Sequence, residues 1–366
     1  MPAYWLEATV VALGLLLLLM EAFGSSTDKE LVRRVAIGGL IFVLVPFYFA
    51  VTPSPDNAEL NRFYVYDNWA IFFKLLALLS TILVLFMAYD YRKVLNQFTE
   101  DPGSDHGTGE FYALPVFACA GMMWMASARD LVSIFVALEL VTITFYILVA
   151  FMRRQVGSLE AGAKYLILGA LSTGFLVYGI AWIYGTTGTT NLPEIAIVLS
   201  DNQSDLASSP TPLLFGLALI LLSLAFKVGA VPMHIWIPDV YQGAPTPTTA
   251  FLSVGSKAAG FIVTLRILDP FFSSDITRTQ TTLIVLILAS LTLLVGNLAA
   301  IPQNNFKRLL AYSSIAHAGF ILLAIAAWHP GNEHSLSTRQ VVSLYLATYL
   351  IITLGAFFVL VVVRDS

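Results

Sequence analysis

Charged residues are scarce in this chain. Of its 366 residues, 11% are Asp, Glu, Lys or Arg, whereas 58% are hydrophobic. Soluble domains carry roughly 25% charged residues, so a soluble protein of this composition could not cover itself with polar surface. The chain is therefore expected to have lipid as its solvent. The formal net charge of −4 comes from scattered residues, and no basic stripe or charged tail suggests nucleic-acid binding.

Cysteine and cofactor motifs are equally scarce. Cys119 is the only cysteine, which excludes an internal disulfide, a cysteine-rich zinc site and an iron–sulfur cluster. The sequence also has no G-x-G-x-x-G and no P-loop. Any redox centres that the protein serves are therefore expected on other chains. Met1–Glu7 has no positive charge and leads into a run long enough to span, so we do not expect a cleavable signal peptide.

Long apolar runs are what the sequence has in abundance. Runs of about 17–25 apolar residues are candidate membrane-spanning helices. Backbone groups in lipid must be satisfied within the segment, and barrel strands need only ~9–11 residues, so runs of this length favour helices. An all-α polytopic bundle is predicted. The runs that meet the rule are Tyr4–Phe23, Leu31–Val51, Trp69–Tyr89, Phe111–Ala128, Leu131–Phe151, Glu160–Tyr184, Pro212–Ile237, Thr246–Leu268, Thr281–Ile301, Phe306–Trp328 and Val341–Val363.

The distribution of Lys and Arg predicts the topology. Cytoplasmic loops carry an excess of positive residues. The loops after odd-numbered spans hold Lys29, Arg33, Arg34, Arg92, Lys93, Arg153, Arg154, Lys307 and Arg308. The loops after even-numbered spans hold fewer, namely Arg62, Arg129, Arg266, Arg278 and Arg339. The N-terminus is therefore predicted outside, and Arg364, after an odd number of spans, inside.

A few ionisable residues fall inside the predicted spans. A charge at the bilayer centre costs about 2.5–3.5 kcal/mol on insertion scales, so such residues are functional candidates. Glu139 is the one carboxylate expected deep in a helix, about eight residues or ~12 Å from the nearer end. We therefore favour a functional role for Glu139 over a structural hydrogen bond. The lysines left after the loops are assigned are Lys74, Lys164, Lys227 and Lys257.

Lys227 stands next to a predicted helix break. Pro232 has no N–H, so the carbonyl of Val228 loses its helical partner, and Gly229 loosens the same turn. Broken helices at membrane depth are tolerated where they line a cavity, and they often build ion sites. The pattern favours a functional lysine over a plain proline kink.

The other lysines differ in their surroundings. Lys257 lies among small residues that allow close helix packing, so it is expected to face protein and to be functional. Lys164 follows Glu160 by one turn and can pair with it, but it is also close enough to a helix end to reach the interface. Lys74 lies near the start of its helix, and the same snorkelling interpretation is favoured there.

His234 follows the predicted break, and His317 lies in the middle of a predicted helix. Neither has a cluster of further ligands around it, so no metal site is expected. For each histidine, proton relay and a structural hydrogen bond are equally favoured. Burial disfavours the charged form of a lysine and a nearby carboxylate favours it, so a series of such groups linked by water can form a switchable proton path.

Two long motifs carry a family resemblance. Phe226–Phe261 reads FKVGAVPMHIWIPDVYQGAPTPTTAFLSVGSKAAGF, and Gly296–Gly319 reads GNLAAIPQNNFKRLLAYSSIAHAG. Both resemble the antiporter-like membrane subunits of NADH:quinone oxidoreductase (respiratory complex I), in particular the subunit N or subunit 2 type. These subunits are related to Na⁺/H⁺ antiporter subunits. Glu160–Gly169 and Val136–Leu140 resemble the same subunit, and the resemblance extends over essentially the whole chain.

The resemblance implies an inverted-repeat fold with a discontinuous seventh helix. It divides the chain into three N-terminal helices (1–110), a first five-helix repeat (111–268) and an incomplete second repeat (281–366). The family's second broken helix, with its own lysine, is missing from this sequence, so we expect a chain that lacks the family's last helices. The residues that match the family's proton path are Glu139, Lys164, Lys227, Lys257, His234 and His317.

The resemblance also implies a function. The chain would be a proton-translocating, non-redox subunit of a translocase that couples electron transfer from NADH to quinone to proton pumping. NADH, FMN, iron–sulfur clusters and quinone would be bound by partner subunits, beside other membrane subunits in a bacterial inner membrane. The alternative is a subunit of a multi-subunit cation/proton antiporter, which the DVYQGAPTP and SKAAGF details disfavour. A membrane scaffold without transport is disfavoured by the ionisable groups inside the helices.

Overall fold

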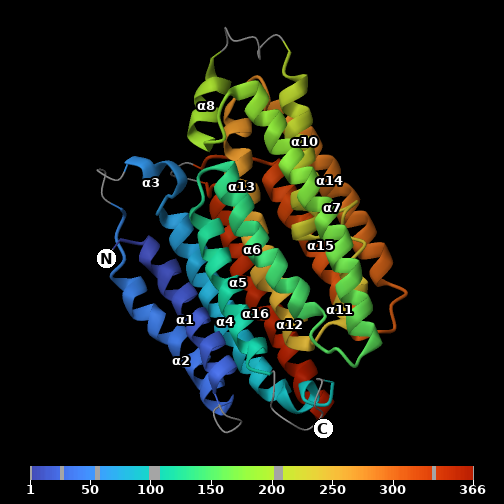
Figure 1. Cartoon of the computed structure of the whole chain (residues 1–366). Helices are drawn as coiled ribbons and strands as arrows, with labels where there is room; N and C mark the ends of the chain where they lie inside the picture. The colour runs from blue at the N-terminus through green and yellow to red at the C-terminus, as the bar shows by residue number, and fades with distance from the viewer. Residues whose placement is uncertain are drawn as a thin grey trace.

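The computed structural model describes residues 2–24, 29–53, 58–98, 108–201, 209–331 and 335–365. Throughout these ranges the long elements are helices, and extended backbone pairs only in isolated bridges. Most helices lie side by side along one axis (Figure 1). In chain order they are α1 Tyr4–Phe23, α2 Lys29–Tyr48, α3 Ala58–Phe63, α4 Asn68–Leu95, α5 Glu110–Ser127, α6 Leu131–Val149, α7 Val156–Thr187, α8 Leu192–Ser200, α10 Thr211–Val228, α11 Ile237–Gly243, α12 Thr246–Phe251, η2 Leu252–Ser256, α13 Lys257–Ser273, α14 Arg278–Ala300, α15 Phe306–Ala326 and α16 Thr338–Asp365.

The predicted bundle of spanning helices is confirmed. Among the described residues, ten helices are long and apolar enough to cross a membrane, with α12, η2 and α13 counted as one. The one predicted span that is not among these ten is Phe111–Ala128, which forms α5. The 18 residues of α5 give it a length of about 27 Å. Most of α5 is buried against neighbouring helices. Protein rather than lipid covers α5, so its sequence can be less apolar than that of the outer helices.

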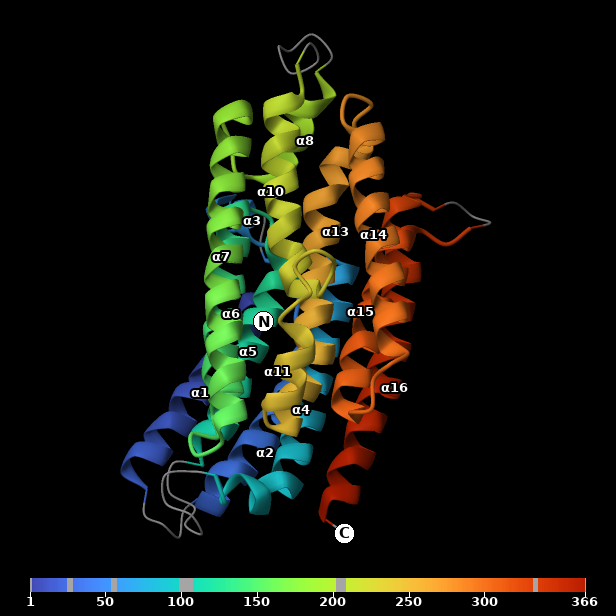
Figure 2. The same ribbon diagram turned by 90° about the vertical axis from the view of Figure 1, so that its right-hand side faces the viewer.

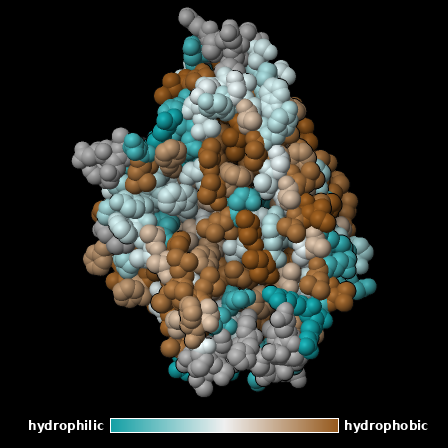
Figure 3. All heavy atoms as spheres, in the orientation of Figure 1, coloured by the Kyte–Doolittle hydropathy of each residue, from teal (hydrophilic) through white to brown (hydrophobic). Residues whose placement is uncertain are grey.

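Burial differs sharply between the middle and the rim of the bundle. The span Thr246–Ser273 is 94% buried, whereas Arg278–Ala300 is 22% buried. Figure 2 shows α7 and α10 on one side of α13 and α14, α15 and α16 on the other. Apolar side chains cover much of the middle of the face in Figure 3. This pattern is expected where lipid surrounds the outer helices.

Polar residues at helix ends position the spans. Asp67 precedes α4, and its carboxylate accepts a hydrogen bond from the backbone N–H of Ala70 at 2.7 Å. Asp130 caps α6 in the same way through the N–H of Val132 at 2.8 Å. Such caps satisfy N–H groups that have no partner within the helix. Asp67 and Asp130 therefore fix where α4 and α6 begin.

The break predicted next to Lys227 is present. α10 ends at Val228 rather than running on to Ile237, and the chain resumes as α11. Gly229 has a left-handed φ of +80°, and the N–H groups of Gly229 and Ala230 both donate to the carbonyl of Ala225, at 2.9 and 2.8 Å. A glycine adopts this conformation without a side-chain penalty. The discontinuous seventh span is therefore confirmed.

A second irregularity was not predicted. The span expected as an uninterrupted helix over Thr246–Leu268 contains the π-helical turn η2 immediately before Lys257. Gly255 in this turn lies against α4, where an added Cβ would stand 3.1 Å from the hydroxyl oxygen of Ser80. π-Helical turns are rare and often occur at functional sites. The predicted division into segments 1–110, 111–268 and 281–366 stays a prediction.

Candidate functional site

Lys227 lies in the last turn of α10, directly before the break. Its side chain is buried, and Nζ donates to the hydroxyl of Thr142 on α6 at 2.9 Å. Thr142 in turn donates to the carbonyl of Leu138 at 2.6 Å. Beyond the break, Nε1 of Trp236 donates to the carbonyl of Phe226 at 3.1 Å, which ties the two halves of the span together. The break therefore holds a buried amine against a hydroxyl group.

Glu139 lies on α6, one turn before Thr142. Its Oε1 accepts a hydrogen bond from the hydroxyl of Thr173 on α7 at 2.7 Å. Lys227 thus contacts the same helix as the carboxylate, through Thr142 rather than through Glu139 itself. The three-residue spacing places Glu139 and Thr142 on neighbouring positions of one helix face.

Two serines join α7 to α10 beside this pair. The hydroxyl oxygens of Ser172 and Ser223 are 3.0 Å apart, and both side chains are buried. Ser172 precedes the threonine that binds Glu139, and Ser223 lies one turn before Lys227. Hydroxyl groups therefore surround the carboxylate and the amine on all three helices α6, α7 and α10.

Lys257 is the first residue of α13 and is also buried. Its Nζ donates to the backbone carbonyl of Ser314 on α15 at 2.5 Å and contacts the hydroxyl of the same residue. That hydroxyl is 3.1 Å from the Tyr241 hydroxyl. The Tyr349 ring completes the site, with its centroid 5.7 Å from Nζ. Lys257 is therefore held by a carbonyl and a hydroxyl oxygen, and it shares with Lys227 a hydroxyl partner on a neighbouring helix.

Lys227 and Lys257 lie on the two helices, α10 and α13, that meet at one close contact. Gly260 lies one turn after Lys257, and an added Cβ there would stand 3.3 Å from Cγ of Lys227. A glycine at this point lets α10 and α13 approach closely. The structure therefore brings the buried Lys227 and Lys257 together at one helix contact, with the partly buried Glu139 on the helix that Lys227 contacts.

The histidines lie in different surroundings. Nδ1 of His317 is 2.6 Å from the hydroxyl of Tyr345, and its ring centroid is 5.0 Å from that of Tyr349. His317 therefore belongs to the surroundings of Lys257. His234 lies between α10 and α11, where its buried Nδ1 has no hydrogen-bond partner within the described part of the chain.

Lys164 stands apart from the buried lysines. Its side chain is 42% exposed, and Nζ is 2.7 Å from carboxylate oxygens of both Glu160 and Asp239. Arg308 binds the other oxygen of Asp239 at 2.8 Å. Partial burial acts to raise the pKa of Asp239, but the hydrogen bonds and charges of Lys164 and Arg308 outweigh it and hold the pKa below its usual range. Lys164 is therefore part of a partly exposed charge cluster.

Comparison with known proteins places the chain in a family. Residues 128–366 match the family described as NADH:quinone oxidoreductase/Mrp antiporter, transmembrane. NADH-quinone oxidoreductase subunit N of Desulforamulus reducens is 41% identical over 363 residues, which cover 98% of this chain and 71% of that protein. The subunit N of Trichlorobacter lovleyi is also 41% identical, over 98% of this chain and 69% of its own length. The chain belongs to the NADH-quinone oxidoreductase subunit N family.

Solved structures agree with this assignment to the subunit N family. The match to respiratory complex I from Thermus thermophilus has a TM-score of 0.72 at 31% identity and covers 97% of this chain and 70% of that one. The Mrp complex from Dietzia gives a TM-score of 0.73 at 22% identity, which shows a shared fold only. The resemblance drawn from the two long motifs is therefore confirmed, and the antiporter alternative has less support.

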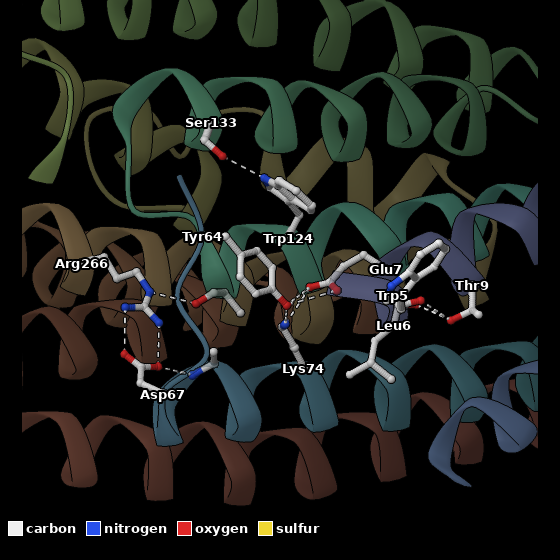
Figure 4. A network of polar contacts seen from close by, with 12 residues as sticks. Trp5, Leu6, Glu7, Thr9, Tyr64, Asp67, Lys74, Trp124, Ser133 and Arg266 are labelled. Carbon is white, nitrogen blue, oxygen red and sulfur yellow. Dashed lines mark hydrogen bonds and ion pairs between the residues drawn. The ribbon is translucent and has the colours of Figure 1, made fainter. Parts of the chain in front are cut away.

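The interpretation of Lys74 was wrong. Lys74 does not reach the interface, because its side chain is fully buried and Nζ lies 2.7 Å from Oε1 of Glu7 on α1. Figure 4 shows both side chains converging with Tyr64, from the segment before α4. Sequence reasoning also passed over Glu7, a carboxylate in the first turn of α1 that is 3% exposed. The position of Lys74 near the start of its helix did not reveal which segments would bury it, because those segments come from distant parts of the chain.

Sequence reasoning also missed the hydroxyl partners of the ionisable groups. Thr142 and Thr173 hold Lys227 and Glu139, and Ser314 holds Lys257. Only Thr142 had a usable signal, since it follows Glu139 by three residues on one helix. Serine and threonine are too common in such helices for the others to stand out.

Proposed function

We propose that this chain is the proton-translocating membrane subunit of an NADH-quinone oxidoreductase and that Glu139, Lys227 and Lys257 carry the protons. The observation that supports this role is the series of two buried lysines and the partly buried Glu139, each hydrogen-bonded to a hydroxyl group of a neighbouring helix. Ionisable groups at such positions are costly and typically belong to proton relays.

The hydroxyl partners suit the transfer of protons. A threonine or serine hydroxyl accepts a hydrogen bond from an ammonium group and donates one onward, so it can pass a proton without a large movement. Thr142 accepts from Lys227 and donates to the backbone carbonyl of Leu138, so to pass a proton on its hydroxyl turns from that carbonyl to water or to a carboxylate. A proton gained or lost at Glu139 changes the electric field at Lys227, which couples the two protonation states.

The remaining parts of the proposal concern the ends of the path and the partners. Lys164, in its exposed cluster, is positioned to exchange protons with water, and His234 and His317 are proposed relay groups. No redox centre is assigned to this chain, so NADH, FMN, iron–sulfur clusters and quinone belong to partner subunits. We place it with other membrane subunits in a bacterial inner membrane, and the Lys and Arg asymmetry puts the N-terminus outside.

The test is Lys227→Met in the assembled complex, measured as protons translocated per NADH oxidised in sealed vesicles. Methionine keeps the volume of the lysine and removes its proton-carrying group, so we expect the ratio to fall by the share of protons that this chain carries. Lys93→Met is the matched control, because Lys93 is exposed near the end of α4. A native ratio in assembled Lys227→Met complex would rule out this path.

A further inference from the structure

A second buried ionic site lies outside the path described above. Glu7 of α1 and Lys74 of α4 form an ion pair at 2.7 Å whose side chains are 4% and 0% exposed. The rings of Tyr64 and Tyr66 lie 4.6 and 4.9 Å from Nζ of Lys74, and Figure 4 shows Tyr64 beside the pair. Both helices are candidate membrane spans, so the pair lies within the part of the chain that is expected to be surrounded by lipid.

Packing alone does not account for these charges. Replacing a buried ion pair by apolar residues of similar volume is often neutral or stabilising, so the pair is weak evidence of a structural role. Ionisable residues inside membrane proteins are expensive and mark ion or proton pathways by default. The pair therefore calls for a function that uses its charges.

Tyr64 links the two charges through one hydroxyl group. This hydroxyl accepts a hydrogen bond from Lys74 at 2.5 Å and lies 3.2 Å from Oε1 of Glu7, to which it donates. A hydroxyl with a donor on one side and an acceptor on the other can pass a proton between them. Glu7, Tyr64 and Lys74 thus form a continuous triad that can exchange a proton within itself.

A pocket with charged residues in its lining lies at the start of α4, on the N-terminal side of Lys74. It has a volume of about 360 Å³ and is lined by residues that include Asp67, Arg266, Arg129 and Trp69. Arg266 binds both oxygens of Asp67, at 2.9 and 3.1 Å. Asp67 caps α4 about 10 Å of helix before Lys74, and Figure 4 shows the two ion pairs side by side along this segment. The pocket lies toward the end of the bundle that carries α3 and α8, and Val65, the neighbour of Tyr64 in the chain, lines it.

Buried hydroxyl groups continue from the triad toward Lys257. Ser80 and Thr81 follow Lys74 along α4, and both are fully buried. The Ser80 oxygen lies against Gly255 of η2. Within η2, the hydroxyl of Ser253 is 3.0 Å from that of Tyr349, whose ring lies beside Lys257. Ser80 and Thr81 both donate to the carbonyl of Ala77, so water is needed to join them to Lys74 and to the hydroxyl groups of η2. With such water, polar groups on α4 and η2 form a route between Lys74 and Lys257.

We propose that Glu7, Tyr64 and Lys74 form a proton-exchange site that connects Lys257 with the pocket at Asp67 and Arg266. The inference rests on the proposed function, because it adds a segment to the same proton path. It assigns to the three N-terminal helices a role in transport as well as in packing.

The test uses the double variant Glu7→Gln with Lys74→Met in the assembled complex. Both charges are removed together, so no unpaired charge is left buried. We expect the number of protons per NADH to fall by the same fraction as in Lys257→Met. The triple variant, which combines all three changes, should lose no more than either parent, since groups in one series give non-additive effects.

The outcomes separate the inference from the proposed function. A lower ratio in Lys257→Met with a native ratio in the double variant overturns the inference and leaves the proposed function intact. If Lys257→Met and the double variant both keep the native number of protons per NADH, the inference and the proposed function are both overturned. An additive loss in the triple variant shows a separate path and also overturns the connection. If the double variant does not assemble, Ser80→Ala with Thr81→Val decides the question, since it leaves the Glu7–Lys74 pair intact and removes the two buried hydroxyl groups on the proposed route to Lys257; a native ratio there overturns the connection.

Discussion

Lys74→Met alone is expected to destabilise the folded subunit by about 3–5 kcal/mol, because it leaves Glu7 buried without its counter-charge. The loss is large compared with the total stability of most folded domains, so little assembled complex should accumulate. The measurement is the amount of assembled subunit in membranes, together with its thermal unfolding midpoint in detergent. Methionine fills the space of the lysine stem, so a cavity contributes little to the expected loss.

The control for this prediction is Lys93→Met on the same helix. Lys93 is exposed, so its replacement should change stability by less than about 0.5 kcal/mol. Adding Glu7→Gln to Lys74→Met should restore most of the lost stability, because no charge is then left unpaired. Equal stability of Lys74→Met and Lys93→Met would contradict the buried ion pair.

Gly229→Ala is expected to cost about 2–5 kcal/mol, the second largest effect. The left-handed φ of +80° costs a residue with a Cβ about 1–2 kcal/mol. The new methyl group would also collide with the side chain of Ile237 at the start of α11, and overpacking adds about 1–3 kcal/mol. Because Lys227 lies two residues before this glycine, we expect proton translocation to fall along with the unfolding midpoint.

Gly174→Ala provides the matched control for the break. Gly174 lies on α7 with helical backbone, and an added Cβ there meets no atom within 4 Å. Alanine should therefore be neutral or stabilise the helix by about 0.5–1 kcal/mol. If Gly229→Ala unfolds at the same temperature as Gly174→Ala, the left-handed turn is not required for the break.

The sequence was a good guide to the helices and to the break. Apolar runs predict membrane-spanning helices because crossing the hydrocarbon core requires about 20 consecutive apolar residues, whichever helices the span packs against. The break at Gly229 was predictable because Pro232 lacks an N–H, which is a property of the residue itself. The π-helical turn was not predictable in this way, since Leu252–Ser256 has no residue that forbids an ordinary α-helix.

The pairing of ionisable residues was the least predictable part. Lys74 and Glu7 are far apart in sequence, and only the folding of α1 and the Tyr64 segment onto α4 makes them partners. The partners of Lys257 likewise come from α15 and α16, well beyond its own helix. Lys227 and Glu139 could be singled out as candidates because the cost of a mid-membrane charge can be judged from one helix at a time, and their role in proton transfer stays a prediction.

The π-helical turn gives α12 and α13 one surplus residue between two ordinary helical stretches. In an α-helix each residue advances the direction of the side chain by about 100°, so a residue lost from Leu252–Ser256 could be absorbed by closing the π turn. The same loss from an uninterrupted helix such as α14 would turn every later side chain away from its neighbour. If one residue is lost here during evolution, the π-helical turn beside Lys257 can absorb the change. The side chains that follow along α13 then keep their directions.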